Sequence, residues 1–152
     1  MGGLKEGTGV IEFAGGSRYE GGFVGDQPGG VGVYATDEFR FEGGFREGKM
    51  NGGDCRCVWG NGRRYDGGYV DDMKHGYGEF TYVNGKIYKG GWANNRMHGE
   101  GKIIYPDETV KYGLWENGMR VEIGNKMINA GVAFTNKPTG QTTPVRKTSH
   151  PD

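Results

Sequence analysis

Residues 76–98 read GYGEFTYVNGKIYKGGWANNRMH, and units of the same 23-residue length occur five times along the chain. Each copy begins with a glycine, at Gly7, Gly30, Gly53, Gly76 and Gly99. Self-similarity at a fixed period of this length is typical of repeat arrays, in which each unit contacts only its neighbours. Because such arrays usually present extended binding surfaces, the period predicts a binding protein rather than an enzyme.

Each unit contains two stretches with strand periodicity. The fifth and seventh residues alternate with polar ones and would share one face of a strand; they are Ile11, Tyr34, Cys57, Phe80 and Ile103, and Phe13, Thr36, Trp59, Tyr82 and Tyr105. Turn signals follow, of which Asn61-Gly62 and Asn84-Gly85 are strong hairpin signals. A second alternating stretch comes next, so the sequence predicts one β-hairpin per unit and no helix in the repeat body.

A glycine lies in the middle of each second stretch, as in Tyr65-x-Gly67-x-Tyr69 and Tyr88-x-Gly90-x-Trp92. Glycine weakens a strand unless something requires it. We interpret it sterically, because a backbone without a Cβ lets a neighbouring aromatic ring lie flat over it. Since an isolated hairpin is marginally stable, the units are expected to stack side by side.

This pattern resembles the MORN ("membrane occupation and recognition nexus") repeat family. The family pattern is Tyr-x-Gly-x-Trp or Phe, then Gly-x-Gly, at a spacing of 23. It is matched by Tyr88–Trp92 leading to Gly99-Glu100-Gly101 and by Tyr65–Tyr69 leading to Gly76 and Gly78. The resemblance covers about residues 7–120. It implies an all-β fold, an elongated single-layer antiparallel sheet of tandem β-hairpins formed by residues 1–120. Residues 121–152 are expected to be a mostly irregular, partly disordered C-terminal extension.

Several units depart from the family pattern. The second has a turn one residue shorter and carries Thr36 in place of an aromatic residue, the third has Cys55 in place of its second glycine, and the fifth has Lys111 in place of a tyrosine. The chain also opens in mid-unit, because Met1–Glu6 aligns with Val24–Gly29. It is either part of a longer array or a short natural protein.

The composition restricts the class of protein. Only 34% of the residues are apolar and 33 are glycine, which rules out a thick two-layer core, while a 12% aromatic content argues against disorder. The 19 basic residues equal the 19 acidic ones, so no net charge favours nucleic acid. Without an apolar run of about 18 residues or a secretory signal at Met1–Gly9, the default is a soluble cytoplasmic protein.

No motif indicates catalysis or a cofactor. No serine lies in a Gly-x-Ser-x-Gly elbow, and Gly76-Tyr77-Gly78 opens a strand rather than a phosphate-binding helix. His75 and His98 occupy one repeat position, but further ligands are lacking, and Cys55-x-Cys57 has no second cysteine pair. The sequence therefore predicts neither enzymatic activity, nor a cofactor, nor a metal site.

Nine aromatic residues repeat along the second stretches and form a stripe. A single-layer sheet cannot bury a whole face by itself, and exposed aromatic patches mark binding sites. The stripe is therefore expected to be both core and groove, in which a helical or extended peptide of a partner protein binds. Its members are Tyr19, Phe23, Phe41, Phe45, Tyr65, Tyr69, Tyr88, Trp92 and Trp115. Self-association through the groove or the sheet ends, giving a homo-oligomer, is a further expectation.

The resemblance also implies a class of partner protein and a cellular location. Members of the family commonly serve at cytoskeletal, ciliary or membrane-associated structures, and one short member associates with a motor protein. This implies a cytoskeletal or motor-protein segment as partner, and the cytoskeleton, a cilium or flagellum, or the inner face of a membrane as location.

Two alternatives remain open. The first is a phosphoinositide- or phospholipid-binding module, with Arg40, Arg63 and Lys86 at the eleventh position as lipid-binding residues; three cations are few for this role. The second is a regulatory repeat domain of a larger enzyme, as in some lipid kinases and protein methyltransferases.

Overall fold

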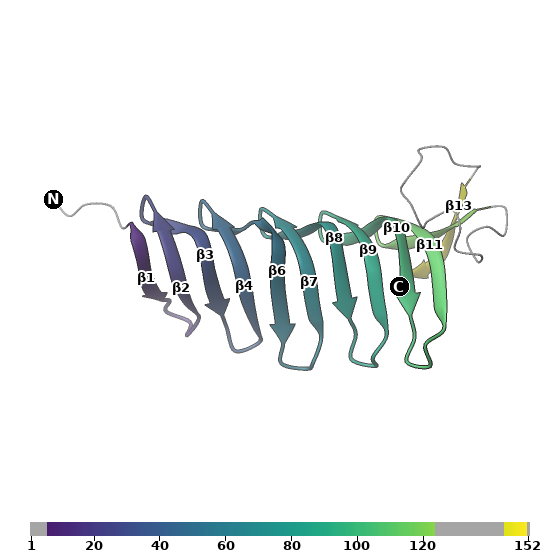
Figure 1. Cartoon of the computed structure of the whole chain (residues 1–152), viewed down its shortest axis with the longest axis horizontal. Coiled ribbons are helices and arrows are strands. Elements are labelled where there is room, and N and C mark those ends of the chain that lie inside the picture. Colours follow the sequence, from purple (N-terminus) through teal and green to yellow (C-terminus); the bar gives the residue numbers. More distant parts are fainter. Residues whose placement is uncertain (1–5, 124–144, 152) are drawn as a thin grey trace.

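The computed structural model describes residues 6–123 and, for the backbone, residues 145–151. These residues form one open antiparallel sheet whose strands follow one another in chain order, without a helix (Figure 1). The predicted all-β, single-layer array is confirmed. The strands are β1 (Gly7–Glu12), β2 (Arg18–Val24), β3 (Gln27–Ala35), β4 (Phe39–Arg46), β5 (Lys49–Met50, paired with β4), β6 (Gly52–Trp59), β7 (Arg64–Val70), β8 (Met73–Thr81), β9 (Ile87–Ala93), β10 (Arg96–Ile104), β11 (Val110–Glu116), β12 (Met119–Ile123) and β13 (Val145–Pro151).

The C-terminal end of the sheet passes the expected boundary at residue 120. β12 continues to Ile123, and β13 pairs with it antiparallel, with Val121 opposite Lys147. Most of the predicted irregular extension falls on residues 124–144, which lie outside the described residues.

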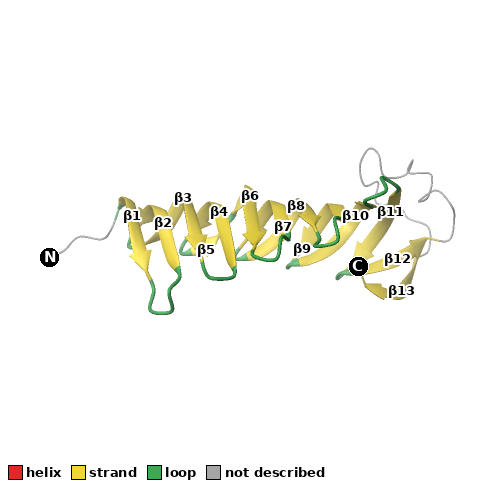
Figure 2. Ribbon diagram, turned by 90° about the horizontal axis from the view of Figure 1, so that it is seen from below, coloured by secondary structure: helices red, strands yellow, loops and turns green. Residues whose placement is uncertain are grey.

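The turns inside the units are those expected from the sequence (Figure 2). In the first unit the N–H of Phe13 donates to the carbonyl of Ser17, and the N–H of Gly16 donates back to the carbonyl of Phe13. The same pair of bonds recurs around the predicted turns at Asn61-Gly62 and Asn84-Gly85. The second unit has a tighter turn, closed by a bond from the Thr36 N–H to the Phe39 carbonyl.

A second kind of turn, which the sequence analysis did not assign, joins successive units. Both central residues have positive φ, which defines the type I′ turn that suits the twist of a hairpin. The pairs are Gly25-Asp26, Glu47-Gly48, Asp71-Asp72, Asn94-Asn95 and Asn117-Gly118. The strand pairs β2–β3, β7–β8 and β9–β10 each contain a register shift, for example between Gly67 and Tyr69. Shifts of this kind bend a strand.

Tyrosine rings lie over glycines of the next unit, not over the middle glycines of the second stretches for which the sequence analysis expected this contact. A Cβ on one of those, Gly67 or Gly90, would first meet backbone atoms of the neighbouring strand. A Cβ on Gly101 would come within 2.7 Å of the Tyr88 ring, and Tyr19 and Tyr65 crowd Gly32 and Gly78 in the same way. Each tyrosine hydroxyl also donates to a backbone carbonyl three residues further on, at 2.8–2.9 Å; the acceptors are Gly22, Gly68 and Gly91. The ring is therefore held both by packing and by a hydrogen bond.

Nine rings join the five units into one file, which we call the buried file. Each ring meets the next edge to face, with centroids 4.8–5.4 Å apart. Such pairs contribute about 0.5–1.5 kcal/mol each beyond the burial of their area. In spatial order the file is Phe23, Tyr19, Phe45, Phe41, Tyr69, Tyr65, Trp92, Tyr88 and Trp115.

In the third unit, the sulfur atom of Cys55 replaces a tyrosine hydroxyl, which explains why this unit departs from the family pattern. Phe41 has no hydroxyl, and its partner on the neighbouring strand is Cys57. Two residues before Cys57, where other units have glycine, is Cys55. A Cβ on Gly43 would lie 2.6 Å from the Cys55 Sγ, whereas at the equivalent Gly67 it would lie 2.7 Å from a tyrosine Oη. The thiol thus occupies the place of the missing hydroxyl, and donates to the Gly52 carbonyl at 3.7 Å.

We predict that Phe41→Tyr and Cys55→Gly are each destabilising but compensate for each other. The new hydroxyl collides with Sγ in the first variant, and a void replaces Sγ in the second, each costing about 1–3 kcal/mol. In the double variant the hydroxyl can donate to the Gly44 carbonyl, as Tyr19 does to Gly22. Urea unfolding followed by tryptophan fluorescence should give a coupling energy of at least about 1 kcal/mol, and additive effects would contradict the exchange.

We also predict that Gly78→Ala destabilises the array by about 2–3 kcal/mol, because the methyl group would displace the Tyr65 ring. Gly53→Ala is the matched control in the neighbouring unit. Nothing lies within 4 Å of a Cβ there and the residue has no positive φ, so its effect should stay within about 1 kcal/mol. Thermal unfolding followed by circular dichroism measures both, and equal effects would show that the ring does not require the glycine.

Candidate functional site

The nine residues predicted to bind a partner are the buried file itself. Their side chains are 0–8% exposed, so they form the core of the sheet. Their burial does not support direct contact with a partner, because each ring already packs against its neighbours in the file. A partner on this face of the sheet, the aromatic face, would meet other residues.

Those residues are a second line of rings, which we call the half-exposed row. Its members keep part of their surface in solvent, up to 43% for Phe13. All of them except Phe13 pack on the buried core, and Phe13 packs on Tyr34. Centroid distances of 5.8–6.4 Å link Phe13 to Trp59 through the intervening rings, and Phe80 connects Trp59 with Tyr82. The row is Phe13, Tyr34, Phe39, Trp59, Tyr82 and Tyr105. Four of these are seventh residues of their units, so the 23-residue period could have identified them.

The aromatic face is hollowed near its N-terminal end. A pocket of about 320 Å³ is lined by Phe13, Tyr34, Pro28, Met50 and Asp72. Its lining also includes Tyr19 and Phe45 of the buried file. An apolar side chain of a bound segment would therefore find rings on several sides of it.

Cations lie over the rings of the half-exposed row. The Arg63 guanidinium is 5.0 Å from the Trp59 ring centroid, and the Lys86 ammonium is 4.6 Å from that of Tyr82. Lys111, the residue that replaces a tyrosine in the fifth unit, lies 5.6 Å from the Tyr105 centroid. Each position allows a cation–π contact, which is worth about 0.5–1 kcal/mol at an exposed site.

Lys74 is the most enclosed of these cations. Its ammonium lies 5.4–5.7 Å from the ring centroids of four residues, Trp59, Tyr65, Phe80 and Trp92. Burial lowers the pKa of Lys74, and the Arg63 charge lowers it further, whereas a Cys57 thiolate would raise it. The ammonium is therefore held in surroundings that disfavour its charge.

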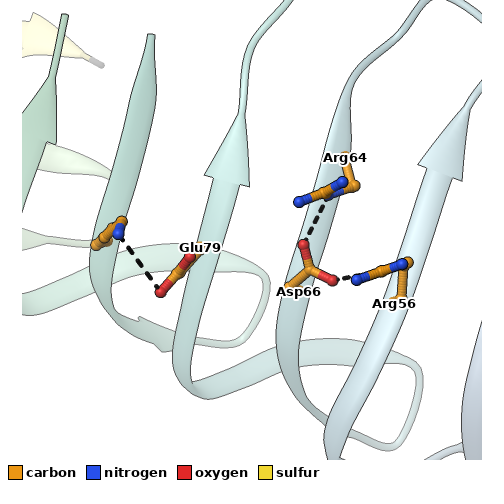
Figure 3. A network of polar contacts seen from close by, with 5 residues as sticks. Arg56, Arg64, Asp66 and Glu79 are labelled. Atoms are coloured by element: carbon orange, nitrogen blue, oxygen red, sulfur yellow. Dashed lines mark hydrogen bonds and ion pairs between the residues drawn. The ribbon is translucent and has the colours of Figure 1, made fainter. Parts of the chain in front are cut away.

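The opposite face, which we call the charged face, neutralises its own charges. Asp66 bridges Arg56 at 2.7 Å and Arg64 at 2.8 Å, and Glu79 pairs with a neighbouring lysine at 3.9 Å (Figure 3). Beside this network is an open depression of about 820 Å³ that is lined largely by glycines and these charged residues. Four of its five Asp, Glu and Arg side chains are already in ion pairs and only Asp54 is not, so this larger hollow offers less to a charged ligand than the aromatic face does.

The three predicted lipid-binding cations do not lie together. Arg40 is on the charged face, where it pairs with Glu42 at 2.9 Å, whereas Arg63 and Lys86 stack on rings of the aromatic face. The physical reason is the shorter turn of the second unit, because a shift of one residue moves a strand side chain to the opposite face. Arg40, Arg63 and Lys86 therefore do not form one basic ridge.

The cysteines are buried and free. Burial raises the pKa of Cys57 from 9.0 to about 11, and burial is also the main cause of the raised pKa of Cys55. Among the described residues, no group of three or more His, Cys, Asp or Glu side chains could hold a metal ion. In the same part of the chain, no helix has the length and hydropathy needed to cross a membrane.

We predict that neither thiol reacts with a disulfide reagent at pH 8 while the chain is folded. For Cys57, the rise of two pKa units lowers the thiolate fraction about a hundredfold, and burial excludes the reagent from both thiols. Absorbance after addition of the reagent should show two thiols per chain in urea and almost none in buffer. A Cys57→Ser variant separates the two sites, and rapid reaction of the folded chain would contradict the burial.

Comparison with known families agrees with the geometry. A family model described as MORN repeat matches residues 1–18, 19–36, 41–52, 65–87 and 88–110. Three of these matches begin at Tyr19, Tyr65 and Tyr88, the tyrosines that lie over glycines. A search of curated proteins found no match. The MORN family is generally non-enzymatic, and its repeats suggest a role in protein or membrane binding. Since the matches cover more than half of its residues, the chain belongs to the MORN repeat family.

Proposed function

We propose that this protein is a non-enzymatic scaffold that binds a helical or extended segment of a partner protein along the half-exposed row. The observation that carries the proposal is the continuity of the row, whose ring contacts extend from Phe13 in the first unit through Phe80 to Tyr82 in the fourth. Contiguous exposed apolar surface of this kind marks interaction sites. Aromatic residues are also those that most often dominate the binding energy of an interface.

The buried file supports this role by holding the row in place. All rings of the row except Phe13 pack on the buried core, in which the members of the file are fixed by edge-to-face contacts and hydrogen bonds. Little conformational entropy would therefore be lost on binding, which is the advantage of a pre-organised surface. Two strands per unit, about 4.8 Å apart, place equivalent rings roughly 10 Å from one another along the array.

The proposal includes a class of partner and a place. By family resemblance, the segment would belong to a cytoskeletal or motor protein in the cytoplasm, at the cytoskeleton, a cilium or the inner face of a membrane. No enzymatic activity is proposed. The hydroxyls of Tyr19, Tyr65 and Tyr88 donate to backbone carbonyls within the core, and both cysteines are buried.

We predict that Phe13→Ala/Trp59→Ala abolishes capture of a partner from native lysate by the full chain. Both rings belong to the half-exposed row, so the variant removes contact surface while leaving the buried file intact. The matched control is Val31→Ala/Tyr77→Ala, which removes two large apolar side chains that are 77% and 59% exposed on the charged face. Quantitative mass spectrometry should show a protein that is lost with the first variant and kept with the second, after circular dichroism has shown that both fold.

Two results would contradict the scaffold. The first is a set of captured proteins that does not change with Phe13→Ala/Trp59→Ala. The second is binding only to vesicles that contain a phosphoinositide, with loss of binding at high salt, because salt screens exposed charge–charge attraction. That second result would establish the lipid-binding alternative instead.

A further inference from the structure

We propose that the segment bound by the half-exposed row is acidic, and that Lys74 is the residue that recognises one of its carboxylates. This inference rests on the proposed function and deepens it, because it states the chemistry of the partner. It is carried by the way in which charge is divided between the two faces of the sheet.

All six ion pairs found among the described side chains lie on the charged face, and they join Arg18, Arg40, Arg56, Arg64 and Lys89 to nearby carboxylates. Within that same part of the chain, the four cations stacked on rings of the aromatic face form no ion pair. They are Arg63, Lys74, Lys86 and Lys111. Five cations of the charged face are therefore neutralised within the chain, whereas the four on the aromatic face carry positive charge that a partner could neutralise.

Lys74 is one of two cations among the five residues at its structural position. In each unit, one residue of the strand after the type I′ turn lies opposite the last aromatic residue of the preceding strand. In three units this residue is Pro28, Met50 or Met97, which pair with Phe23, Phe45 and Trp92. Lys74 takes the place opposite Tyr69, and Arg120 takes the place opposite Trp115. A cation thus stands where apolar residues suffice for packing, which suggests a role other than packing.

The surroundings of Lys74 strengthen its interaction with an incoming carboxylate. Four rings replace part of the water around the ammonium, and a charge–charge interaction is stronger where water is excluded. Lys74 remains half-buried rather than sealed, so its charge can be reached from the aromatic face. A carboxylate seated above the rings would give this cation a counter-charge that no described side chain provides.

The positions of the other cations predict the spacing of the acidic residues along the bound segment. Arg63, Lys86 and Lys111 belong to successive units, which are roughly 10 Å apart along the array. Seven residues of an α-helix rise about 10.5 Å. An amphipathic helix lying along the row would therefore present an acidic residue about every seventh position, between apolar residues that contact the rings.

The acidic turn at the edge of the sheet, next to Lys74, would repel an acidic segment. Asp71 and Asp72 are exposed at the type I′ turn before Lys74. The Asp72 carboxylate accepts a hydrogen bond from the Met50 N–H at 2.8 Å, which holds it at the turn. The bound helix is therefore expected to place its acidic side toward the ring-stacked cations and away from this turn.

The test is selection from a phage-displayed library of random peptides on the immobilised full chain. We expect the selected pool to combine Asp or Glu with large apolar residues, and its members to lose binding to Phe13→Ala/Trp59→Ala. One synthetic peptide from the pool should bind Lys74→Met at least about tenfold more weakly by fluorescence anisotropy, as for loss of a charge-assisted hydrogen bond. Met97 shows that methionine is accommodated at this position.

Lys89→Met is the matched control, since it removes the same charge from an ion pair on the charged face, and it should bind the peptide as the unchanged chain does. Replacing the acidic residues of the peptide by amides should remove the difference between Lys74→Met and the unchanged chain. Equal or tighter binding to Lys74→Met overturns the inference, as does a selected pool without acidic residues that still depends on Phe13 and Trp59. A pool that ignores Phe13→Ala/Trp59→Ala, or no enrichment at all, overturns the proposed function as well.

Discussion

The structure depends on a tyrosine ring lying flat on a glycine of the next unit. This contact brings two backbones close enough for one ring to touch both hairpins, and the tyrosine hydroxyl then finds a carbonyl within hydrogen-bond distance. A side chain larger than hydrogen at Gly32, Gly78 or Gly101 would push the ring out. The high glycine content and the aromatic content of the chain thus serve the same packing contact.

This contact explains how a single sheet can have a core. In most domains two layers bury each other, whereas here nine rings bury one another in a file along a single layer. The third unit shows that the space, rather than the residue type, is what must be kept. Phe41 and Cys55 together provide the atoms that Tyr65 provides alone in the next contact. Each unit is bound to its neighbour by the same kind of contact, so the array can vary locally without loss of the fold.

The two faces of the sheet have separate roles because strand side chains alternate. One face carries ion pairs within strands, as between Arg40 and Glu42, and across strands, as between Arg56 and Asp66. The other keeps a row of half-exposed rings and cations without carboxylate partners among the described residues. An interaction surface on the second face follows from this division.

Repeat length, strand periodicity and turn residues were sufficient to predict the array of hairpins, because these depend on residues close in sequence or one period apart. They also indicated that rings pack on glycines, but they assigned the contact to the middle glycines of the second stretches, whereas the rings lie over Gly32, Gly78 and Gly101. The same signals could not tell which rings are buried. Tyr65 and Trp59 are both large aromatic residues on the same face, and only the bend and the register of the strands place the first in the file and the second in the row. Register also separated Arg40 from Arg63 and Lys86. The four rings that enclose Lys74 come from four strands of two neighbouring units. This enclosure was therefore decided by the tertiary structure alone.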